Sequence, residues 1–126
     1  MTGGDSSKTS GFPKRLRLRK QAEFDRVFGG KVYAADDTLV MNGTSNELGR
    51  SRIGLSVSRK VGNAVARNRW KRLLREAFRT QQSELPQGFD LVVRPRRGAT
   101  PDFLRIRASL RSLAERIARK LQRGRS

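Results

Sequence analysis

Cations recur every four residues in one stretch of the sequence. Residues four apart lie on the same side of an α-helix, so these side chains form one stripe if the stretch is helical. Like charges at this spacing destabilise a helix by about 0.2–0.5 kcal/mol per pair. Bound phosphates would offset that cost, because arginine grips phosphate through two hydrogen bonds and binding releases counterions. The stripe consists of Arg67, Lys71, Arg75 and Arg79, and Asn68 and Arg72 extend it.

The whole chain is strongly basic. It has 126 residues and a formal net charge of +18, with 29 Lys and Arg against 11 Asp and Glu. Such a charge destabilises a compact chain through self-repulsion and is typical of proteins that bind polyanions. Nucleic acid is the first candidate partner, and an anionic membrane surface is the second. A solvated cationic face is the alternative for the helix taken alone.

The residue types that are missing exclude much of ordinary enzyme chemistry. The chain has neither cysteine nor histidine, so it lacks a thiolate nucleophile, the usual general base near neutral pH and the commonest zinc ligands. Only carboxylates, Lys, Tyr and Ser remain for catalysis, which argues against a conventional hydrolase. No apolar run is long enough to span a membrane, and the first residues lack a secretory signal. A soluble, cytosolic protein is expected.

The hydrophobic pattern predicts a small α/β sandwich with the element order α-β-β-β-α-β-α. Residues 1–13, rich in Gly, Ser and Thr, are expected to form a disordered tail, and residues 14–126 one domain. A hairpin loop is expected at Asn46–Gly49. The predicted elements are a helix over Gln21–Phe28, strands over Lys31–Ala35, Thr38–Gly43 and Arg52–Ser58, a helix over Asn63–Gln82, a strand over Asp90–Arg94, and a final helix capped by Thr100 and ending near Leu121.

Two elements have faces of contrasting character. In the third strand, Gly54, Ser56 and Ser58 alternate with larger apolar residues, so one side is small and polar and leaves room for a ligand. In the long basic helix, an apolar stripe faces the core and the cationic stripe lies on a different side. That apolar stripe consists of Ala66, Trp70, Leu73, Leu74, Ala77 and Phe78.

Two further charged segments allow alternative interpretations. The run Lys14–Lys20 contains five cations in seven residues, and is either a solvated charge run or a basic arm that lies along phosphates. The pair Asp36 and Asp37 could be taken for a magnesium site, but an ordinary acidic turn is favoured.

The stretch RIGLSVSRKVGNAVARNRWKRLLREAFR, residues 52–79, closely resembles the protein component of bacterial ribonuclease P. The match centres on Arg67-Asn68-Arg69 followed by Lys71-Arg72, and the upstream RLRLRKQAEFDRVF is similar to the arm and first helix of that family. The resemblance implies a fold like domain 2 of ribosomal protein S5, with a left-handed β-α-β crossover. It also implies an accessory subunit that is not itself catalytic, paired with an RNA that uses Mg2+ to cleave the 5′ leader from precursor tRNA.

The resemblance further implies three groups of RNA-binding residues, whereas the sequence identifies no metal ligand. Phe24 and Phe28 match the aromatic positions of the leader cleft, although simple core packing is the alternative for both. Met41 is expected to stand where many relatives have an aromatic residue. The expected contacts to the catalytic RNA are Arg67, Asn68, Arg69, Lys71, Arg72 and Arg75, those to the leader are Phe24, Phe28, Ser56, Arg59 and Lys60, and those of a basic arm are Arg15, Arg17 and Arg19.

Composition alone leaves other RNA-binding roles open. A purely structural protein, such as a ribosomal one, has the same charge and the same lack of catalytic groups. The motif around Arg67 favours the ribonuclease P subunit. A membrane-surface protein is less favoured, because the apolar stripes are needed for the core.

Overall fold

The computed structural model describes residues 13–124. Most of the predicted tail, residues 1–12, lies outside them. The order of helices and strands matches the prediction. The elements are η1 (Lys14–Leu16), α2 (Gln21–Gly29), β2 (Tyr33–Ala35), β3 (Leu39–Ser45), β4 (Arg52–Leu55), η2 (Arg59–Val61), α3 (Ala64–Gln81), η3 (Gln82–Glu84), β5 (Phe89–Pro95) and α4 (Phe103–Gly124).

The four strands form one sheet with the order β2-β3-β5-β4. β3 pairs antiparallel with β2 and β5, whereas β4 pairs parallel with β5. The expected hairpin at Asn46–Gly49 is therefore wrong, since β5 lies between the two strands that this loop joins. The parallel pair is connected through α3, which makes a β-α-β crossover. Its left hand stays a prediction.

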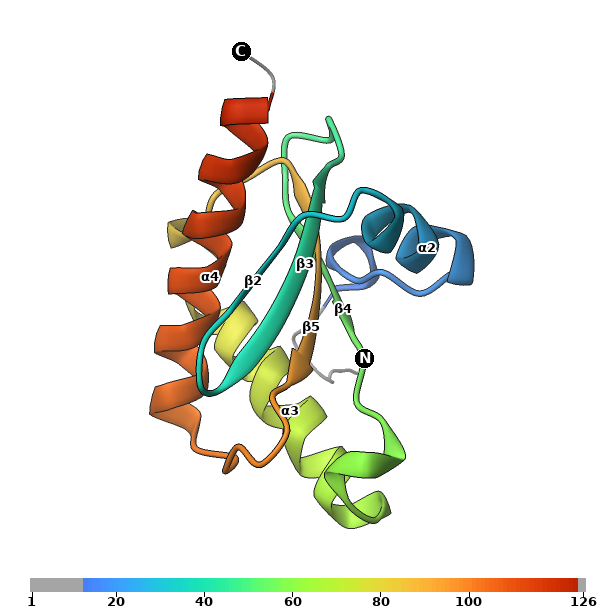
Figure 1. The fold of residues 1–126 in the computed structure, drawn as a ribbon, viewed down its shortest axis with the longest axis vertical. Helices are drawn as coiled ribbons and strands as arrows, with labels where there is room; N and C mark the ends of the chain where they lie inside the picture. The colour runs from blue at the N-terminus through green and yellow to red at the C-terminus, as the bar shows by residue number, and fades with distance from the viewer. Residues whose placement is uncertain (1–12, 125–126) are drawn as a thin grey trace, which may run out of the picture.

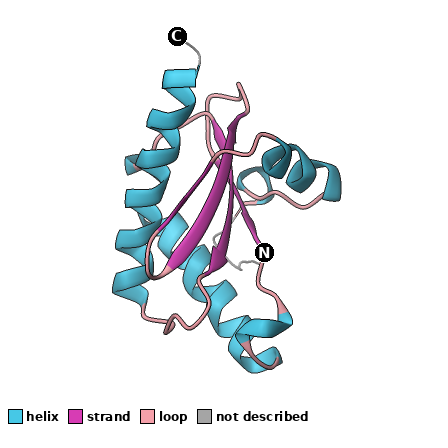
Figure 2. Ribbon diagram, in the orientation of Figure 1, coloured by secondary structure: helices cyan, strands magenta, loops and turns pink. Residues whose placement is uncertain are grey.

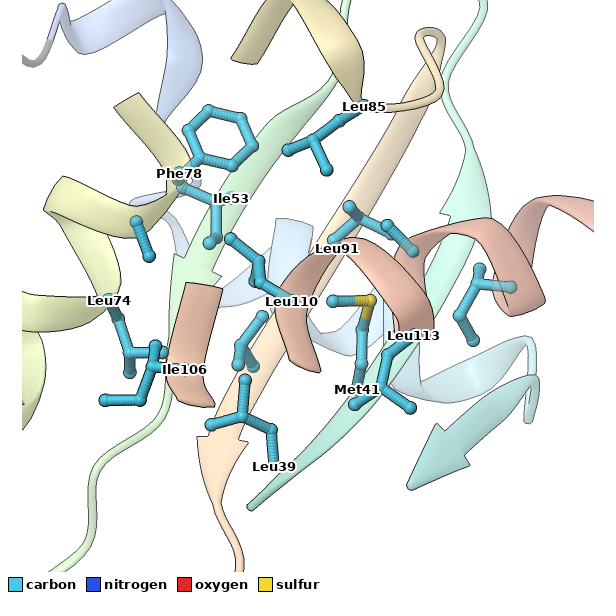
Figure 3. Packing of buried hydrophobic residues seen from close by; sticks show 14 of the residues in the cluster. Leu39, Met41, Ile53, Leu74, Phe78, Leu85, Leu91, Ile106, Leu110 and Leu113 are labelled. Carbon is cyan, nitrogen blue, oxygen red and sulfur yellow. The ribbon is translucent and has the colours of Figure 1, made fainter. Parts of the chain in front are cut away.

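Helices cover the sheet unequally (Figures 1 and 2). α3 and α4 pack on one face and on each other, while α2 contacts β3 and β5 on the opposite face. The main core lies between the sheet and the two long helices. Figure 3 shows its centre, where side chains from β3, β4 and β5 meet those of α3 and α4. A much smaller cluster beneath α2 consists of Leu18, Val27 and Val92, with Phe24 packed against it.

The core confirms the predicted apolar stripes. Trp70, Leu74, Ala77 and Phe78 of α3 are buried, and Leu73 is partly buried beside them. Met41 is also fully buried in this core. Its side chain therefore points away from α2, and it cannot stand for an aromatic residue of a cleft on the α2 side.

The start of α4 differs from the prediction. The helix begins at Phe103, and the Asp102 Oδ1 atom accepts a hydrogen bond from the Arg105 amide at 3.0 Å. Asp102 therefore caps the helix in place of Thr100. Both residues are good caps, so the local sequence does not discriminate between them. None of the helices within residues 13–124 is long and apolar enough to cross a membrane.

Candidate nucleic-acid interface

The position of α3 determines where its cations point. Gly62 ends η2 with a φ of 152°, where an added Cβ would lie 2.9 Å from the Cβ of Ala66. The Asn63 side chain then caps α3 by accepting a hydrogen bond from the Ala66 amide at 3.0 Å. Because the core face is buried, the predicted RNA-binding residues lie on the remaining surface. Arg67 and Lys71 are half-buried there, and Asn68, Arg69, Arg72 and Arg75 are exposed.

One member of the predicted stripe differs from the others. Arg79 forms an ion pair with Glu76 one turn earlier in the helix. The hydrogen bond and the charge of Glu76 raise the pKa of Arg79 above its usual range. No ion pair to a described residue is seen for Arg67, Lys71 or Arg75. The cationic part of α3 that is available to a ligand is thus its first three turns.

The arm before α2 is anchored by its leucines. Leu16 and Leu18 are buried, and the Leu18 amide donates to the Ile53 carbonyl of β4 at 2.9 Å. Arg17 forms an isolated parallel bridge with Ile53. The leucines thus fix the backbone of this segment against the sheet, and both interpretations of its cations stay open. Arg15 and Arg19 are exposed, and Arg17 is half-buried.

The arm and α3 together line a cavity of about 290 Å³ at the edge of β4, which we call the basic groove. The arm contributes Arg17 and Arg19, and α3 contributes Lys71 and Arg75. Within residues 13–124, no acidic residue lines it. The remaining lining is apolar and consists of Leu18, Phe24, Ile53 and Leu55. Residues more than fifty positions apart in the sequence thus form one cationic site.

The charges in the basic groove repel one another. Partial loss of water around the Arg75 guanidinium, together with the positive charge of Arg17, lowers the pKa of Arg75 from its usual value. A guanidinium remains protonated in proteins all the same. An anion entering the groove would relieve this repulsion between the Arg17 and Arg75 guanidinium groups.

The predicted leader-binding residues do not all meet in one hollow. Phe24 lines the basic groove, and its ring covers Gly54, where an added Cβ would lie 2.8 Å from the Phe24 Cζ atom. The room expected over the small face of the third strand is filled at this point. Phe28 is 36% exposed. It lines neither the basic groove nor the larger cavity that Lys60 lines. Ser56 is half-buried, and its amide donates to the Val93 carbonyl at 2.9 Å.

Lys60 belongs to a second cavity, about 460 Å³ in volume, which we call the β5-end cavity. Arg59 is exposed beside it in η2. Trp70 lines this cavity although only 3% of the Trp70 surface is exposed. Three arginines that the sequence interpretation did not single out also line it: Arg94, Arg96 and Arg97. The sequence PRRG directly after a buried strand is the signal that could have identified them.

A buried carboxylate on the α2 side was also missed. Asp90 is fully buried and accepts hydrogen bonds from Arg52, Asn46 and Arg26. Burial would raise the pKa of Asp90, but the hydrogen bonds of Arg52 and Asn46 and the charges of Arg52 and Arg26 outweigh it. The pKa is therefore lowered from the ordinary value of 3.8.

Asp36 and Asp37, which precede β3, lie in a turn. One Asp36 oxygen accepts the amides of Thr38 and Leu39 at 2.9 and 3.0 Å, and the other accepts the Ser109 hydroxyl at 2.6 Å. Asp37 accepts the Thr38 hydroxyl at 3.1 Å. These contacts favour the turn interpretation. Within residues 13–124, no three acidic side chains lie close enough together to hold a metal ion.

Both the sequence and the fold are similar to those of known proteins. A family model described as Ribonuclease P matches residues 12–118. The ribonuclease P protein component of Thermotoga maritima is 37% identical over 114 residues, covering 86% of this chain and 97% of the relative. That of Desulfovibrio desulfuricans is 41% identical over 114 residues, covering 86% and 88%.

Solved structures agree with these relatives. The RNase P protein from Thermotoga maritima superposes with a TM-score of 0.73 and 35% identity, covering 79% of this chain and 96% of that one. The Staphylococcus aureus RNase P protein gives a TM-score of 0.70 and 35% identity, covering 82% and 94%. The family match, residues 12–118, thus includes the arm, the sheet, α2, α3 and most of α4. This chain belongs to the ribonuclease P protein family.

Proposed function

We propose that this chain is the accessory protein of a ribonuclease P whose catalyst is RNA, and that its basic groove docks onto that RNA. Family membership assigns it the subunit role in tRNA 5′ processing. The observation that carries the docking proposal is the groove itself, where Lys71 and Arg75 of α3 converge with Arg17 and Arg19 of the arm, and no acidic side chain from residues 13–124 is among the lining residues. Phosphates satisfy such a site by direct hydrogen bonds and by release of counterions.

The docking surface extends from the groove along α3. Lys71 and Arg75 lie at its centre, and Arg17 and Arg19 close it from the arm. Other residues on the outward side of α3, exposed or half-buried, supply further contacts to the catalytic RNA, in line with the family resemblance. These are Arg67, Asn68, Arg69 and Arg72, with Arg15 at the start of the arm.

The 5′ leader of precursor tRNA is proposed to lie on the α2 side of the sheet. Phe28 is the more accessible stacking platform, because the Phe24 ring is partly covered by its packing over Gly54. Stacking on an aromatic ring stabilises a bound base by about 1–3 kcal/mol and tolerates any sequence. Ser56, Arg59 and Lys60 continue this path toward the β5-end cavity, whose rim adds further cations.

The chemistry is proposed to belong to the RNA. The chain has no His or Cys to serve as an ordinary general base or thiolate nucleophile, and residues 13–124 contain no cluster of three acidic side chains that could hold a metal ion. Magnesium ions bound by RNA phosphates would activate the attacking water and stabilise the leaving oxygen. The protein contributes binding and orientation. Because bacterial precursor tRNA is made in the cytoplasm, that is the proposed location.

Reconstitution tests this function directly. The protein is mixed with a ribonuclease P RNA from the same genome and labelled precursor tRNA at low magnesium. We expect a single 5′ cut that neither component produces efficiently alone. Cleavage by RNA-free protein would refute the accessory role. RNA binding without any stimulation of cleavage would favour a purely structural RNA-binding protein.

A further inference from the structure

α2 carries both predicted leader-stacking residues but has little apolar contact with the sheet. Val27 is its only fully buried residue among the nine of the helix. The cluster beneath it contains just Leu18, Val27 and Val92, with Phe24 partly buried beside them. So small a cluster holds a helix weakly, since stabilisation scales with the apolar area removed from water. Some other interaction must contribute to the position of α2.

That interaction comes from Asp90, which lies near the start of β5 on the α2 side. One Asp90 oxygen accepts Arg52 Nε at 2.9 Å and Asn46 Nδ2 at 2.8 Å, and the other accepts Arg52 Nη2 at 2.7 Å. The second oxygen also pairs with Arg26 of α2. Arg26 in turn donates to the Ser45 carbonyl at 3.0 Å. The carboxylate thus joins α2 to the ends of β3, β4 and β5.

A second link lies one turn earlier on α2. Arg52 Nη1 donates to Glu23 Oε2 at 3.2 Å. The other Glu23 oxygen accepts the amides of Arg19 and Lys20 at 2.9 and 3.0 Å, which caps the helix. Glu23 and Arg26 therefore fix both the start and the rotation of α2 through one centre, Arg52 with Asp90.

The Phe24 ring is adjacent to this network. Phe24 follows Glu23 directly, and its ring covers Gly54. Gly54 pairs with Val92, two residues after Asp90 on the same strand. Residues two apart in a strand share a face, so Asp90 and the ring occupy the same side of the sheet. A small rotation of α2 would shift the Phe24 ring along that face.

We infer that Asp90 is a positioning residue: its buried carboxylate holds α2 through Arg26 and Arg52, and thereby sets the place of the aromatic rings that receive the leader. This inference rests on the proposed leader-binding function. Asp90 itself touches no RNA in this arrangement, because it is fully buried. Its removal should change the recognition of the leader and leave the docking surface of α3 intact.

The test uses Asp90→Asn and, as a control, Glu84→Gln. Each substitution raises the net charge by one, so non-specific attraction to RNA changes equally. Glu84 is half-exposed and pairs with Arg111, away from α2. Each protein is reconstituted with the catalytic RNA, and dissociation constants are measured for precursor tRNA with a leader and for mature tRNA. A third variant, Arg26→Met, removes the contacts of Arg26 with Asp90 and with the Ser45 carbonyl. It leaves Asp90 paired with Arg52 and Asn46, and Arg52 paired with Glu23.

We expect Asp90→Asn and Arg26→Met to weaken binding of the leader-bearing substrate by at least about fivefold, the lower limit for one stacked base. Binding of mature tRNA should stay within about twofold of wild type, as should all values for Glu84→Gln. Faster amide exchange confined to α2 should accompany the loss. If Asp90→Asn fails to fold, Arg26→Met decides the outcome.

Two results would overturn the inference. One is equal weakening for substrates with and without a leader, which would indicate general destabilisation. The other is that Arg26→Met, and Asp90→Asn if it folds, both bind the leader-bearing substrate with wild-type affinity. Failure of the proposed leader-binding function gives a distinct result, because the wild-type holoenzyme would then show no preference for the leader-bearing substrate. That result would refute both the leader-binding proposal and the inference about Asp90.

Discussion

Neutralising the basic groove is the most direct test of RNA docking. The perturbation is the double variant Lys71→Gln/Arg75→Gln, which removes the two α3 cations that line the groove and leaves Arg17 and Arg19 in place. The matched control is Arg105→Gln/Arg119→Gln on α4. Both of these arginines are exposed, and neither lines the groove. Each double variant removes two positive charges.

The expected size of the effect follows from counterion release. If each groove cation neutralises one phosphate, the slope of log affinity against log salt falls by about 0.7–0.9 per cation, or about 1.4–1.8 for the pair. If this contribution vanishes near 1 M salt, affinity at about 0.15 M salt drops about 15- to 30-fold. That loss corresponds to about 1.6–2 kcal/mol of binding free energy.

The assay is equilibrium binding of the protein to the catalytic RNA across a salt series, with thermal unfolding measured in parallel. We expect a reduced slope and a large loss for the groove variant, and a loss below about threefold for the α4 control, whose charges act only at long range. An unchanged salt slope in a folded groove variant would refute the docking argument. So would equal losses in the two double variants.

Three further predictions concern the fold around the site. Gly54→Ala should displace the Phe24 ring, since the added Cβ would lie 2.8 Å from its Cζ atom; we expect a loss of about 1–3 kcal/mol in urea unfolding and weaker binding of leader-bearing substrate, and wild-type values for both would contradict the close contact. The lowered pKa of Asp90 stabilises the fold at pH values above 3.8, the ordinary pKa of an aspartate, and this contribution is lost as pH falls through the lowered pKa. Urea unfolding at a series of acidic pH values should show that loss. The free energy of unfolding of a folded Asp90→Asn should depend less on pH. Asp102→Ala should lower the free energy of unfolding by about 1 kcal/mol, because a helix cap is lost, whereas Thr100→Ala should change it little. A larger loss in Thr100→Ala than in Asp102→Ala would show that Thr100 is the cap.

Local patterns predicted the elements well because their causes are local. The spacing of Trp70, Leu74 and Phe78 identified the buried face of α3, and the same spacing separated its cations from that face. Alternation around Ile53 identified the core side of β4. Each inference depends only on the period of a helix or a strand. That period can be read within one segment, without knowledge of the segments that pack against it.

The errors lie where the answer depends on contacts between distant segments. The resemblance places Met41 where many relatives have an aromatic residue, yet strand register turns its side chain into the core against α4. The loop at Asn46–Gly49 was taken for a hairpin because nothing local shows that β5 inserts between β3 and β4. Gly54 looked like open space, but Phe24, thirty positions earlier in the chain, fills it.

Residue types and their spacing are enough to show a basic α/β chain without ordinary catalytic groups, and the motif around Arg67 identifies the family. Composition and helical period suffice for that, because charge and amphipathicity are properties of single segments. Only the tertiary structure decided that the arm joins α3 in one cationic groove, and that Asp90 ties α2 to the sheet across 64 positions of sequence. Those sites exist because the sheet order brings remote residues within hydrogen-bonding or Coulombic range, and no local pattern encodes that order.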